Sequence, residues 1–226
     1  SGTVVSKGRG AGFLASPEKL DQFLEEIFSK TEAKISLKTR IGMEEPEEFF
    51  RLLEIYNKYP LEELIVHPRV QKELYRGTPH YETFRYAMEH SKNPLCYNGD
   101  LVSVDSYVNL LADWEKEQAC DRAKVTSVMV GRGVLKDPAL IEKLAAYASG
   151  EAYEADEEKK LPAFHDRLVA DYGKEFSGDQ NVLFKMKELW SYLIVRFPGK
   201  EKEAKAIRKA ERLEEYQAAV RRVFSE

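Results

Sequence analysis

The chain has 226 residues, of which 43% are hydrophobic and 33% are charged, and its net charge is −4. This composition is typical of a globular protein with a real core, and no apolar run approaches the ~18 residues that a membrane-spanning helix needs. Its two cysteines, Cys96 and Cys120, give neither a disulfide framework nor a metal-ligand spacing, so we expect no metal site and a reducing, cytoplasmic setting.

The first predicted helix begins at Ser16 and Pro17, a capping residue followed by proline at the first helical position. Its apolar face consists of Leu20, Phe23, Leu24, Ile27 and Phe28. An apolar run over Ile35–Arg40 predicts the first strand. Pro46 then opens a second helix, which we expect to turn four side chains toward the core: Phe49, Phe50, Leu53 and Tyr56.

The alternation of strands and helices continues along the chain. Leu64–His67 predicts a second strand and Leu95–Asn98 a third, with a helix opened by Thr78 and Pro79 between them. Ser103 caps a further helix, and Ser127–Gly131 predicts the fourth strand. The strands begin roughly 30 residues apart, the length of one strand–helix unit. This order predicts a parallel sheet with helices outside it.

The strand pattern stops near Leu140. Residues 151–160 are a polar, acidic stretch that fits a linker or a solvated helix end. We predict a linker over residues 151–162, which makes residues 1–150 an α/β domain. Helical patterns then run over Phe164–Phe176, Val182–Phe197 and Lys202–Phe224. We therefore predict a small all-α helical bundle over residues 163–226. Its slight excess of basic side chains, on an otherwise acidic chain, suggests a polyanionic partner.

Two glycine motifs follow the third and fourth predicted strands: Asn98, Gly99 and Asp100, and then Gly131, Arg132 and Gly133. Glycine leaves the backbone N–H groups accessible, because a Cβ would hold an anion away. In a (β/α)8 barrel the loops after the seventh and eighth strands commonly bind phosphate in this way. The two motifs together predict a phosphate site, although Asn98 and Gly99 alone also fit an ordinary turn.

Four motifs occur in register along the chain: Lys38 to Gly42, His67 to Arg69, Asn98 to Asp100, and Gly131 to Gly133. In this order they resemble the tRNA-dihydrouridine synthases. The tail resembles that family's C-terminal helical domain through Phe164 and His165, Lys185 to Tyr192, and Arg208 to Glu211. The opening residues Ser1 to Gly10 resemble the segment that follows the family's Asn-x-Gly-Cys-Pro motif.

The resemblance implies a partial TIM barrel, with strands five to eight in residues 1–150, followed by a tRNA-binding helical domain at residues 163–226. It places the family's proton-donating cysteine upstream of Ser1, so the resemblance implies no catalytic residue within this chain. Because the chain begins with Ser1 and supplies half of a barrel, we expect it to be a portion of a longer enzyme that is inactive alone. The longer protein is expected to be a monomer, whereas the exposed sheet edges of the portion predict self-association.

The family reduces the C5–C6 double bond of uridine in tRNA with FMN and NADPH. By resemblance, Lys38 contacts the flavin ring, His67 lies beside the cofactor, and the FMN phosphate is held by Asn98, Gly99, Asp100, Gly131 and Arg132. Two plainer interpretations stay open. Lys38 could be a rim lysine paired with a carboxylate, and His67 could be structural.

The resemblance also implies RNA contacts, for which we name Arg40, Arg69, Lys7, Arg9, Lys185 and Lys187. For Arg40 the alternative is a salt bridge with Glu44 or Glu45, and Arg69 could serve FMN or pair locally. Five further tail cations belong to the same expectation: Arg196, Lys200, Lys205, Arg208 and Lys209. The alternative is a solvated helix face, because glutamates interleave with these cations.

Two other functions remain compatible with the sequence. The chain could act as a non-catalytic RNA-binding or assembly module, since its tail is present. It could also belong to another phosphate-binding barrel flavin oxidoreductase that acts on a small molecule.

Overall fold

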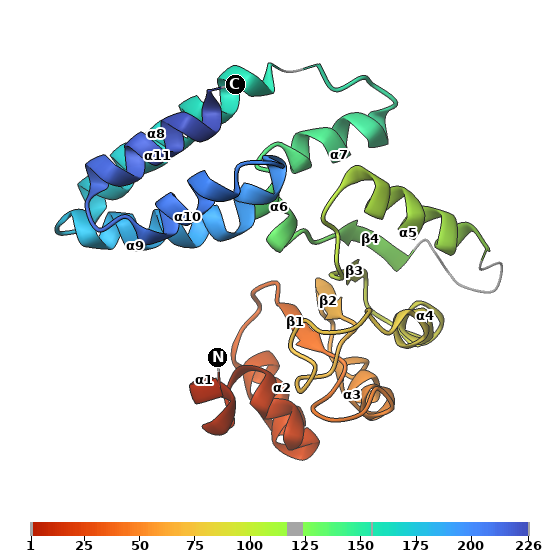
Figure 1. The fold of residues 1–226 in the computed structure, drawn as a ribbon. Coiled ribbons are helices and arrows are strands. Elements are labelled where there is room, and N and C mark those ends of the chain that lie inside the picture. Colours follow the sequence, from red (N-terminus) through yellow and green to blue (C-terminus); the bar gives the residue numbers. More distant parts are fainter. Residues whose placement is uncertain (1, 117–123, 155, 226) are drawn as a thin grey trace. The chain divides into compact units, whose positions relative to one another are not determined.

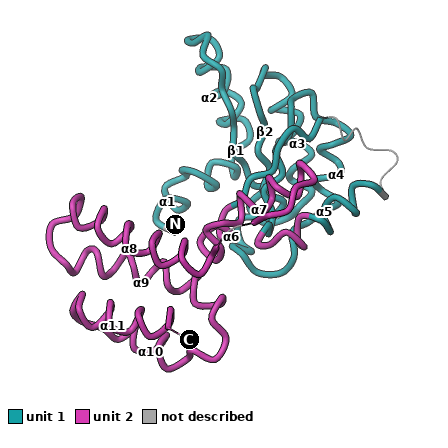
Figure 2. Tube along the Cα trace, turned by 90° about the horizontal axis from the view of Figure 1, so that it is seen from above, with its two compact units in different colours: residues 1–101, 108–130 teal, residues 102–107, 131–226 magenta. Residues whose placement is uncertain are grey.

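The computed structural model describes residues 2–116, 124–154 and 156–225, so Cys120 lies outside the described residues. Contacts between Cα atoms divide the chain into two compact units. The first comprises residues 1–101 and 108–130, and the second comprises residues 102–107 and 131–226 (Figure 2). Apart from residues 102–107, the second unit begins at Gly131, whereas the sequence predicts a domain boundary at residue 150. That boundary stays a prediction.

A four-stranded sheet forms the centre of the first unit (Figure 1). Its strands are β1 (Ser36–Arg40), β2 (Glu63–His67), β3 (Leu95–Tyr97) and β4 (Val125–Val128). They pair in parallel and in chain order, β1-β2-β3-β4, which confirms the predicted parallel sheet. The helices are α1 (Gly2–Ser6), the 3-10 helix η1 (Gly10–Ala15), α2 (Pro17–Lys30), α3 (Glu48–Tyr56), α4 (Tyr81–His90) and α5 (Val104–Lys116).

One face of the sheet packs against helices and forms the core of this unit. Leu64 and Val66 of β2 are fully buried, as are Phe49 of α3 and Phe84 of α4. Tyr97 of β3 makes edge-on ring contacts with Phe84 and with Trp114 of α5. Figure 1 shows α3 and α4 on the same side of the strands.

Side chains alternate along a strand, so the residues between these point to the opposite face. The register aligns Lys38 with Ile65, Ile65 with Cys96, and Cys96 with Ser127, in one row across the sheet. We call this side, which lies opposite the helices, the open face. Lys38 and Ser127 at its two ends are exposed, whereas Cys96 in the middle is buried. The open face therefore carries polar side chains at an otherwise apolar sheet.

Two sequence expectations in this unit need correction. The fourth strand covers Val125–Val128, not 127–131, because Gly131 leaves the extended region with φ −108° and ψ −103° and precedes a helix. Phe50 does not turn into the core. It is 41% exposed and packs on the Tyr86 ring, with centroids 4.4 Å apart, because it lies about 100° around the helix from Phe49.

The second unit is helical. It contains α6 (Arg132–Lys136), α7 (Leu140–Ser149), α8 (Glu157–Glu175), α9 (Asp179–Leu193), the 3-10 helix η3 (Ile194–Arg196), α10 (Glu201–Lys209) and α11 (Leu213–Phe224). Its core gathers residues of the last helices around Met186, Trp190 and Tyr216. None of the described helices is both long and apolar enough to cross a membrane.

The helix boundaries of this unit differ from the sequence expectations in two places. The predicted single helix 202–224 is two helices, because Ala210 adopts an extended conformation with ψ 132° and interrupts the helical path. The long helix α8 begins at Glu157, within the predicted linker, which agrees with the alternative of a solvated helix end for this stretch. Asp156 caps its first turn by accepting a hydrogen bond from the Lys159 N–H at 3.2 Å.

A buried polar network crosses the core of the helical unit. Trp190 donates its indole N–H to the Tyr216 hydroxyl at 2.7 Å, and that hydroxyl lies 2.6 Å from Nε2 of the buried His165. Nδ1 of His165 lies 3.0 Å from a carboxylate oxygen of Asp166. Because a carboxylate only accepts, Nδ1 carries the proton and Nε2 accepts from Tyr216. The network is therefore satisfied only by neutral His165.

We expect this network to make the helical unit sensitive to acid. Burial lowers the pKa of His165 below its ordinary value of 6.5, opposed by Asp166. As the pH falls through 6.5, the unfolded chain binds the proton first, so the free energy of unfolding decreases by at most about 1.4 kcal/mol per pH unit. Trp190 fluorescence in a Trp114→Phe background reports unfolding of this unit. In His165→Gln the free energy of unfolding should depend less on pH between pH 7 and 5. An unchanged slope would show that His165 is not the group responsible.

Candidate functional site

The carboxyl ends of the strands bring several predicted site residues to one edge of the sheet. Arg40 ends β1 and is in register with His67, which ends β2. Asn98 follows β3, where its backbone N–H donates to the Val66 carbonyl at 3.0 Å. Its side-chain amide donates to the Met129 carbonyl beyond β4 at 2.8 Å. We call this edge the rim, and we include Lys38, which lies two residues before Arg40 on the same face of β1.

Lys38 lies on the open face with its ammonium group unpaired. Among the described residues it has no hydrogen bond or ion pair, so the carboxylate partner considered from the sequence is not observed there. Although the side chain reaches solvent, desolvation by the surrounding protein lowers its pKa, and the charge of Arg40 lowers it further. The position therefore holds a cation that lacks a counter-charge among the described residues.

His67 is only 7% exposed and is neutral at pH 7. Burial lowers its pKa to about 4, and the nearby charges of Arg40, Lys38 and Arg69 act in the same direction. Neither ring nitrogen has a hydrogen-bond partner in the part of the chain that the structure describes. A neutral imidazole presents one donor and one acceptor, so His67 can offer both to a ligand.

Arg40 is held by the loop that follows β2. Its guanidinium donates to the carbonyls of Val70 and Leu74, each at 2.8 Å, and lies 5.6 Å from the centre of the Tyr75 ring. The alternative salt bridge with Glu44 or Glu45 is not formed, because those carboxylates pair with Lys72. Arg40 thus keeps its charge at the rim without a carboxylate.

Arg69 is completely buried and pairs locally. It makes two parallel hydrogen bonds to the Asp100 carboxylate, at 2.9 and 2.6 Å, and also donates to the carbonyls of Arg76 and Gly77. These bonds fasten the loop after β2 to the loop after β3. The structure therefore favours the local-pairing alternative for Arg69 over a direct contact with RNA.

The two glycine motifs have different structural roles. A Cβ at Gly99 would lie 2.6 Å from the Tyr97 hydroxyl, so packing alone requires glycine there. A Cβ at Gly131, by contrast, would meet nothing within 4 Å among the described atoms. Gly131 precedes α6 in the second unit, and Arg132 is the first residue of that helix. Close approach of a ligand is one reason for glycine where packing does not require it.

The predicted RNA-binding lysines of the tail are engaged within their own unit. Lys187 donates to the Ala210 carbonyl at the end of α10. Lys185 lies 3.3 Å from the Glu188 carboxylate and 5.8 Å from the centre of the Phe184 ring. Lys7 and Arg9 are exposed between α1 and η1.

Tyr75 was missed by sequence reasoning. It is 56% exposed, and its ring centre lies 6.1 Å from that of His67. The preceding Leu74 has φ +56°, an unusual value for a branched residue, which shows that the loop is held in a constrained shape. The one signal in the sequence is that Tyr75 is an aromatic residue close to the His67–Arg69 motif. Loops carry no periodic pattern that would have placed its side chain.

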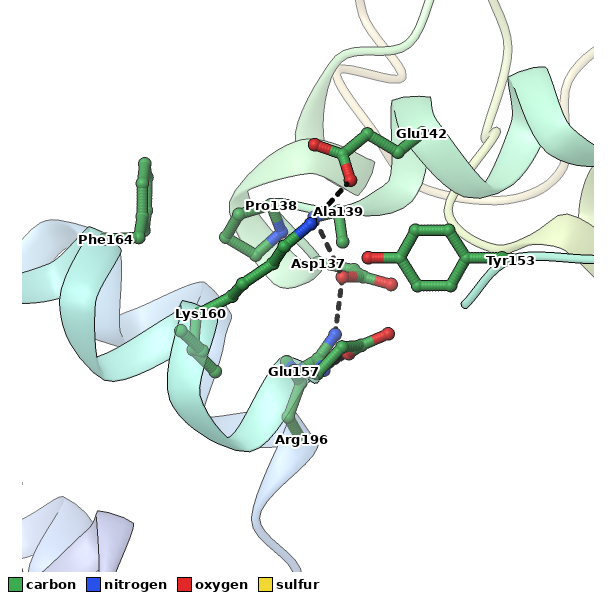
Figure 3. A pocket seen from close by; sticks show the side chains of 10 residues that line it. Asp137, Pro138, Ala139, Glu142, Tyr153, Glu157, Lys160, Phe164 and Arg196 are labelled. Atoms are coloured by element: carbon green, nitrogen blue, oxygen red, sulfur yellow. Dashed lines mark hydrogen bonds and ion pairs between the residues drawn. The ribbon is translucent and has the colours of Figure 1, made fainter. Parts of the chain in front are cut away.

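A pocket of about 420 Å³ in the second unit contains none of the rim residues (Figure 3). Beside it, Lys143 and Arg196 each pair with both Asp137 and Glu157. These half-buried charges balance one another and join α7, α8 and η3, so we interpret the cluster as structural. No group of three His, Cys, Asp or Glu side chains suited to a metal occurs among the described residues.

Comparison with known proteins identifies the family whose sequence model this chain matches. The family model described as dihydrouridine synthase matches residues 1–224. The chain is 28% identical over 154 residues to the tRNA-dihydrouridine(16) synthase of Pseudomonas putida, which covers 67% of this chain and 45% of that protein. It is 23% identical over 195 residues to tRNA-dihydrouridine synthase B of Shewanella oneidensis, covering 84% of this chain and 57% of that protein. The chain therefore spans about half the length of the curated relatives it matches.

Proposed function

This chain belongs to the dihydrouridine synthase family, and from that premise we propose that it supplies the cofactor-holding and RNA-contacting part of an FMN-dependent tRNA-dihydrouridine synthase. In this proposal β1–β4 are the fifth to eighth strands of a TIM barrel, the reductant is NADPH, and the setting is cytoplasmic. The observation that carries it is that Lys38 and the neutral His67, both on the open face, have no hydrogen-bonding partner among the described residues.

The residues at the rim fit the flavin and phosphate groups of FMN. Lys38 and His67 offer hydrogen-bonding groups that lack partners among the described residues. His67 is buried, and burying a polar group without a partner is costly, so a polar ligand over the open face would stabilise it. By the resemblance, Asn98, Gly99, Asp100, Gly131 and Arg132 would form the phosphate loops, and Gly131 leaves room for a ligand, since a Cβ there would meet nothing within 4 Å among the described atoms.

The chain's own side chains would position and charge-balance the cofactor. The Lys38 ammonium would favour negative charge on the adjacent part of the ligand, since a cation in a partly desolvated position interacts more strongly than one in bulk water. His67 would orient the cofactor through hydrogen bonds. Because it is neutral, it would add no second positive charge beside that of Lys38. When bound, FMN supplies the hydride-transfer chemistry that the side chains lack.

The substrate in this proposal is uridine in tRNA, because the relatives are tRNA-dihydrouridine synthases by name. A target base must leave the RNA stack before it reaches a flavin, and exposed aromatic rings commonly receive such bases. Tyr75 offers an exposed ring at the rim, and Arg40 offers a charge beside it. We therefore propose Arg40 and Tyr75 as substrate-side groups.

A titration of FMN followed by flavin fluorescence tests the cofactor site. Saturable binding by the chain is expected. Gly131→Val should weaken it at least tenfold, because the larger side chain would occupy the space of the phosphate. Gly173→Val is the matched control, since a Cβ there also meets nothing within 4 Å and Gly173 lies in α8, away from the motif. Equal affinities for these two variants, with circular dichroism unchanged, would count against the phosphate assignment.

A further inference from the structure

A closed group of four charges lies directly after α6. Lys143 of α7 pairs with the carboxylates of Asp137 and Glu157, at 2.7 and 2.6 Å. Arg196 of η3 pairs with the same two carboxylates, at 2.5 Å from Asp137. The four side chains are between 17% and 28% exposed, so solvent screens their charges only in part. We call these four residues the charge cluster.

Asp137 connects the charge cluster to α6 through its backbone. Its N–H donates to the Gly133 carbonyl at 2.8 Å and so closes the last turn of the helix. Its carboxylate also accepts a hydrogen bond from the Ala139 N–H at 3.1 Å, in the turn that leads into α7. Figure 3 shows the Asp137 and Arg196 side chains pointing toward each other. The charges that bind Asp137 therefore also fix the end of α6.

Apolar packing alone holds α6 only weakly. Among residues 132–136, all of which the structure describes, only Gly133 is buried, and Leu135 is 37% exposed. A helix of five residues is also too short to be stable without tertiary contacts. Although α6 contacts α9 and η3, its position depends strongly on the groups that bind its end. These groups converge on Asp137.

The other end of α6 carries two residues that the proposed function assigns to the FMN phosphate. Gly131 directly precedes the helix, and Arg132 is its first residue. The Gly131 carbonyl accepts a hydrogen bond from the Val134 N–H at 3.3 Å, so the motif and the helix share one turn. At about 1.5 Å of rise per residue, the five-residue helix is only roughly 8 Å long. A displacement of its last turn therefore also displaces its first.

We propose that the charge cluster positions Gly131 and Arg132 for the FMN phosphate, and that Asp137 and Glu157 are positioning residues. The inference deepens the proposed function and rests on it. Groups that are already in place bind a ligand more tightly than groups that must be ordered on binding. Glu157 is the first residue of α8, so the cluster holds the end of α6 from the helical bundle.

The ratio of FMN affinity to riboflavin affinity tests this proposal in the full chain, because riboflavin lacks the phosphate. Flavin fluorescence measures both affinities. Asp137→Asn removes one charge of the cluster at the end of α6, and Glu157→Gln removes one from α8 without changing the segment that carries the motif. Asp171→Asn is the matched control. Asp171 of the same unit also accepts hydrogen bonds from two cations, Arg167 and Lys174, at 2.6 and 3.0 Å.

Both cluster variants should lower the ratio about three- to tenfold, the range that coupling between contacting groups produces. Their riboflavin affinity and the ratio for Asp171→Asn should stay within about twofold of wild type. A merely structural role would weaken the binding of both flavins equally and leave the ratio unchanged. If Asp137→Asn does not fold, as judged by circular dichroism, the ratio for Glu157→Gln decides.

Two results would overturn the inference. An unchanged ratio in Glu157→Gln would show that the bundle side of the cluster does not influence the phosphate contacts. A ratio lowered equally in Asp171→Asn would show that the loss of any paired carboxylate in this unit has the same effect.

The wild-type ratio separates this inference from the proposed function. If the wild-type chain binds neither flavin, or binds FMN and riboflavin equally, the phosphate assignment of the proposed function fails, and the inference fails with it. If the wild-type chain prefers FMN and Glu157→Gln keeps that preference, the phosphate assignment stands and only the inference is wrong.

Discussion

Replacing Asp100 by alanine is expected to destabilise the first unit by about 2–4 kcal/mol. The change leaves the guanidinium of Arg69, which has no exposed surface, with the carbonyls of Arg76 and Gly77 as its only hydrogen-bond partners in the described part of the chain. Breaking a buried ion pair from one side commonly costs 3–5 kcal/mol, and the lower value is expected here because the Asp100 side chain is 39% exposed.

The backbone conformation at Asp100 makes it possible to separate the loss of the ion pair from the cost of backbone strain. Its φ is +34°, a value that costs a branched or alanine side chain about 1 kcal/mol more than glycine. Asp100→Gly should therefore be less harmful than Asp100→Ala, although both lose the carboxylate. Asp100→Asn should be the mildest, because its oxygen still accepts one bond from Arg69 and asparagine tolerates positive φ.

Urea unfolding followed by Trp114 fluorescence in a Trp190→Phe background measures these differences, since Trp114 packs on Phe84 and Tyr97 within the affected unit. The expected order of stability is wild type, Asn, Gly, Ala. Equal values for the Gly and Ala variants would show that the φ at this position carries no strain. An unchanged midpoint for Asp100→Ala would show that Arg69 does not need its partner.

The parallel sheet was predictable because each strand is a short apolar run followed by a turn signal, and because helix-forming segments separate the runs. The end of β4 was not, since Met129 and Val130 continue the apolar pattern while the backbone already turns toward α6. Likewise, the break between α10 and α11 falls at Ala210, Glu211 and Arg212, where no glycine or proline marks it. Such breaks are set by packing of the flanking helices rather than by local preference.

The rim shows a similar limit for the candidate site. The sequence places Arg40 and His67 at the ends of their predicted strands, and the register of the parallel sheet brings these two residues together. The partners of Arg69 and Arg40 lie in loops that only tertiary folding brings near, so sequence could not separate local pairing from ligand contact. Lys187 is the same case, since its acceptor belongs to another helix.

Lys38→Met is expected to weaken FMN binding by about 10- to 100-fold, which corresponds to the 1.5–3 kcal/mol typical of a hydrogen bond to a charged group. The same change should leave thermal stability unchanged or slightly higher, because the wild-type ammonium is partly desolvated and has no partner among the described residues. Loss of binding without loss of stability is the signature of a group kept for a ligand. Lys34→Met is the matched control, since Lys34 is exposed and paired with Glu62 near the opposite end of β1.

The pH dependence of FMN affinity gives an independent check on Lys38. A lysine that binds the ligand as a cation loses that contribution as the pH rises through its pKa, and the lowered pKa of Lys38 moves the loss below the ordinary value of 10.5. Wild-type affinity, measured by flavin fluorescence, should therefore decline at a pH below the ordinary lysine value of 10.5, and the decline should disappear in Lys38→Met. A wild-type profile parallel to that of Lys38→Met, or equal affinities for Lys38→Met and Lys34→Met, would place the flavin away from Lys38 and leave the open face to another ligand.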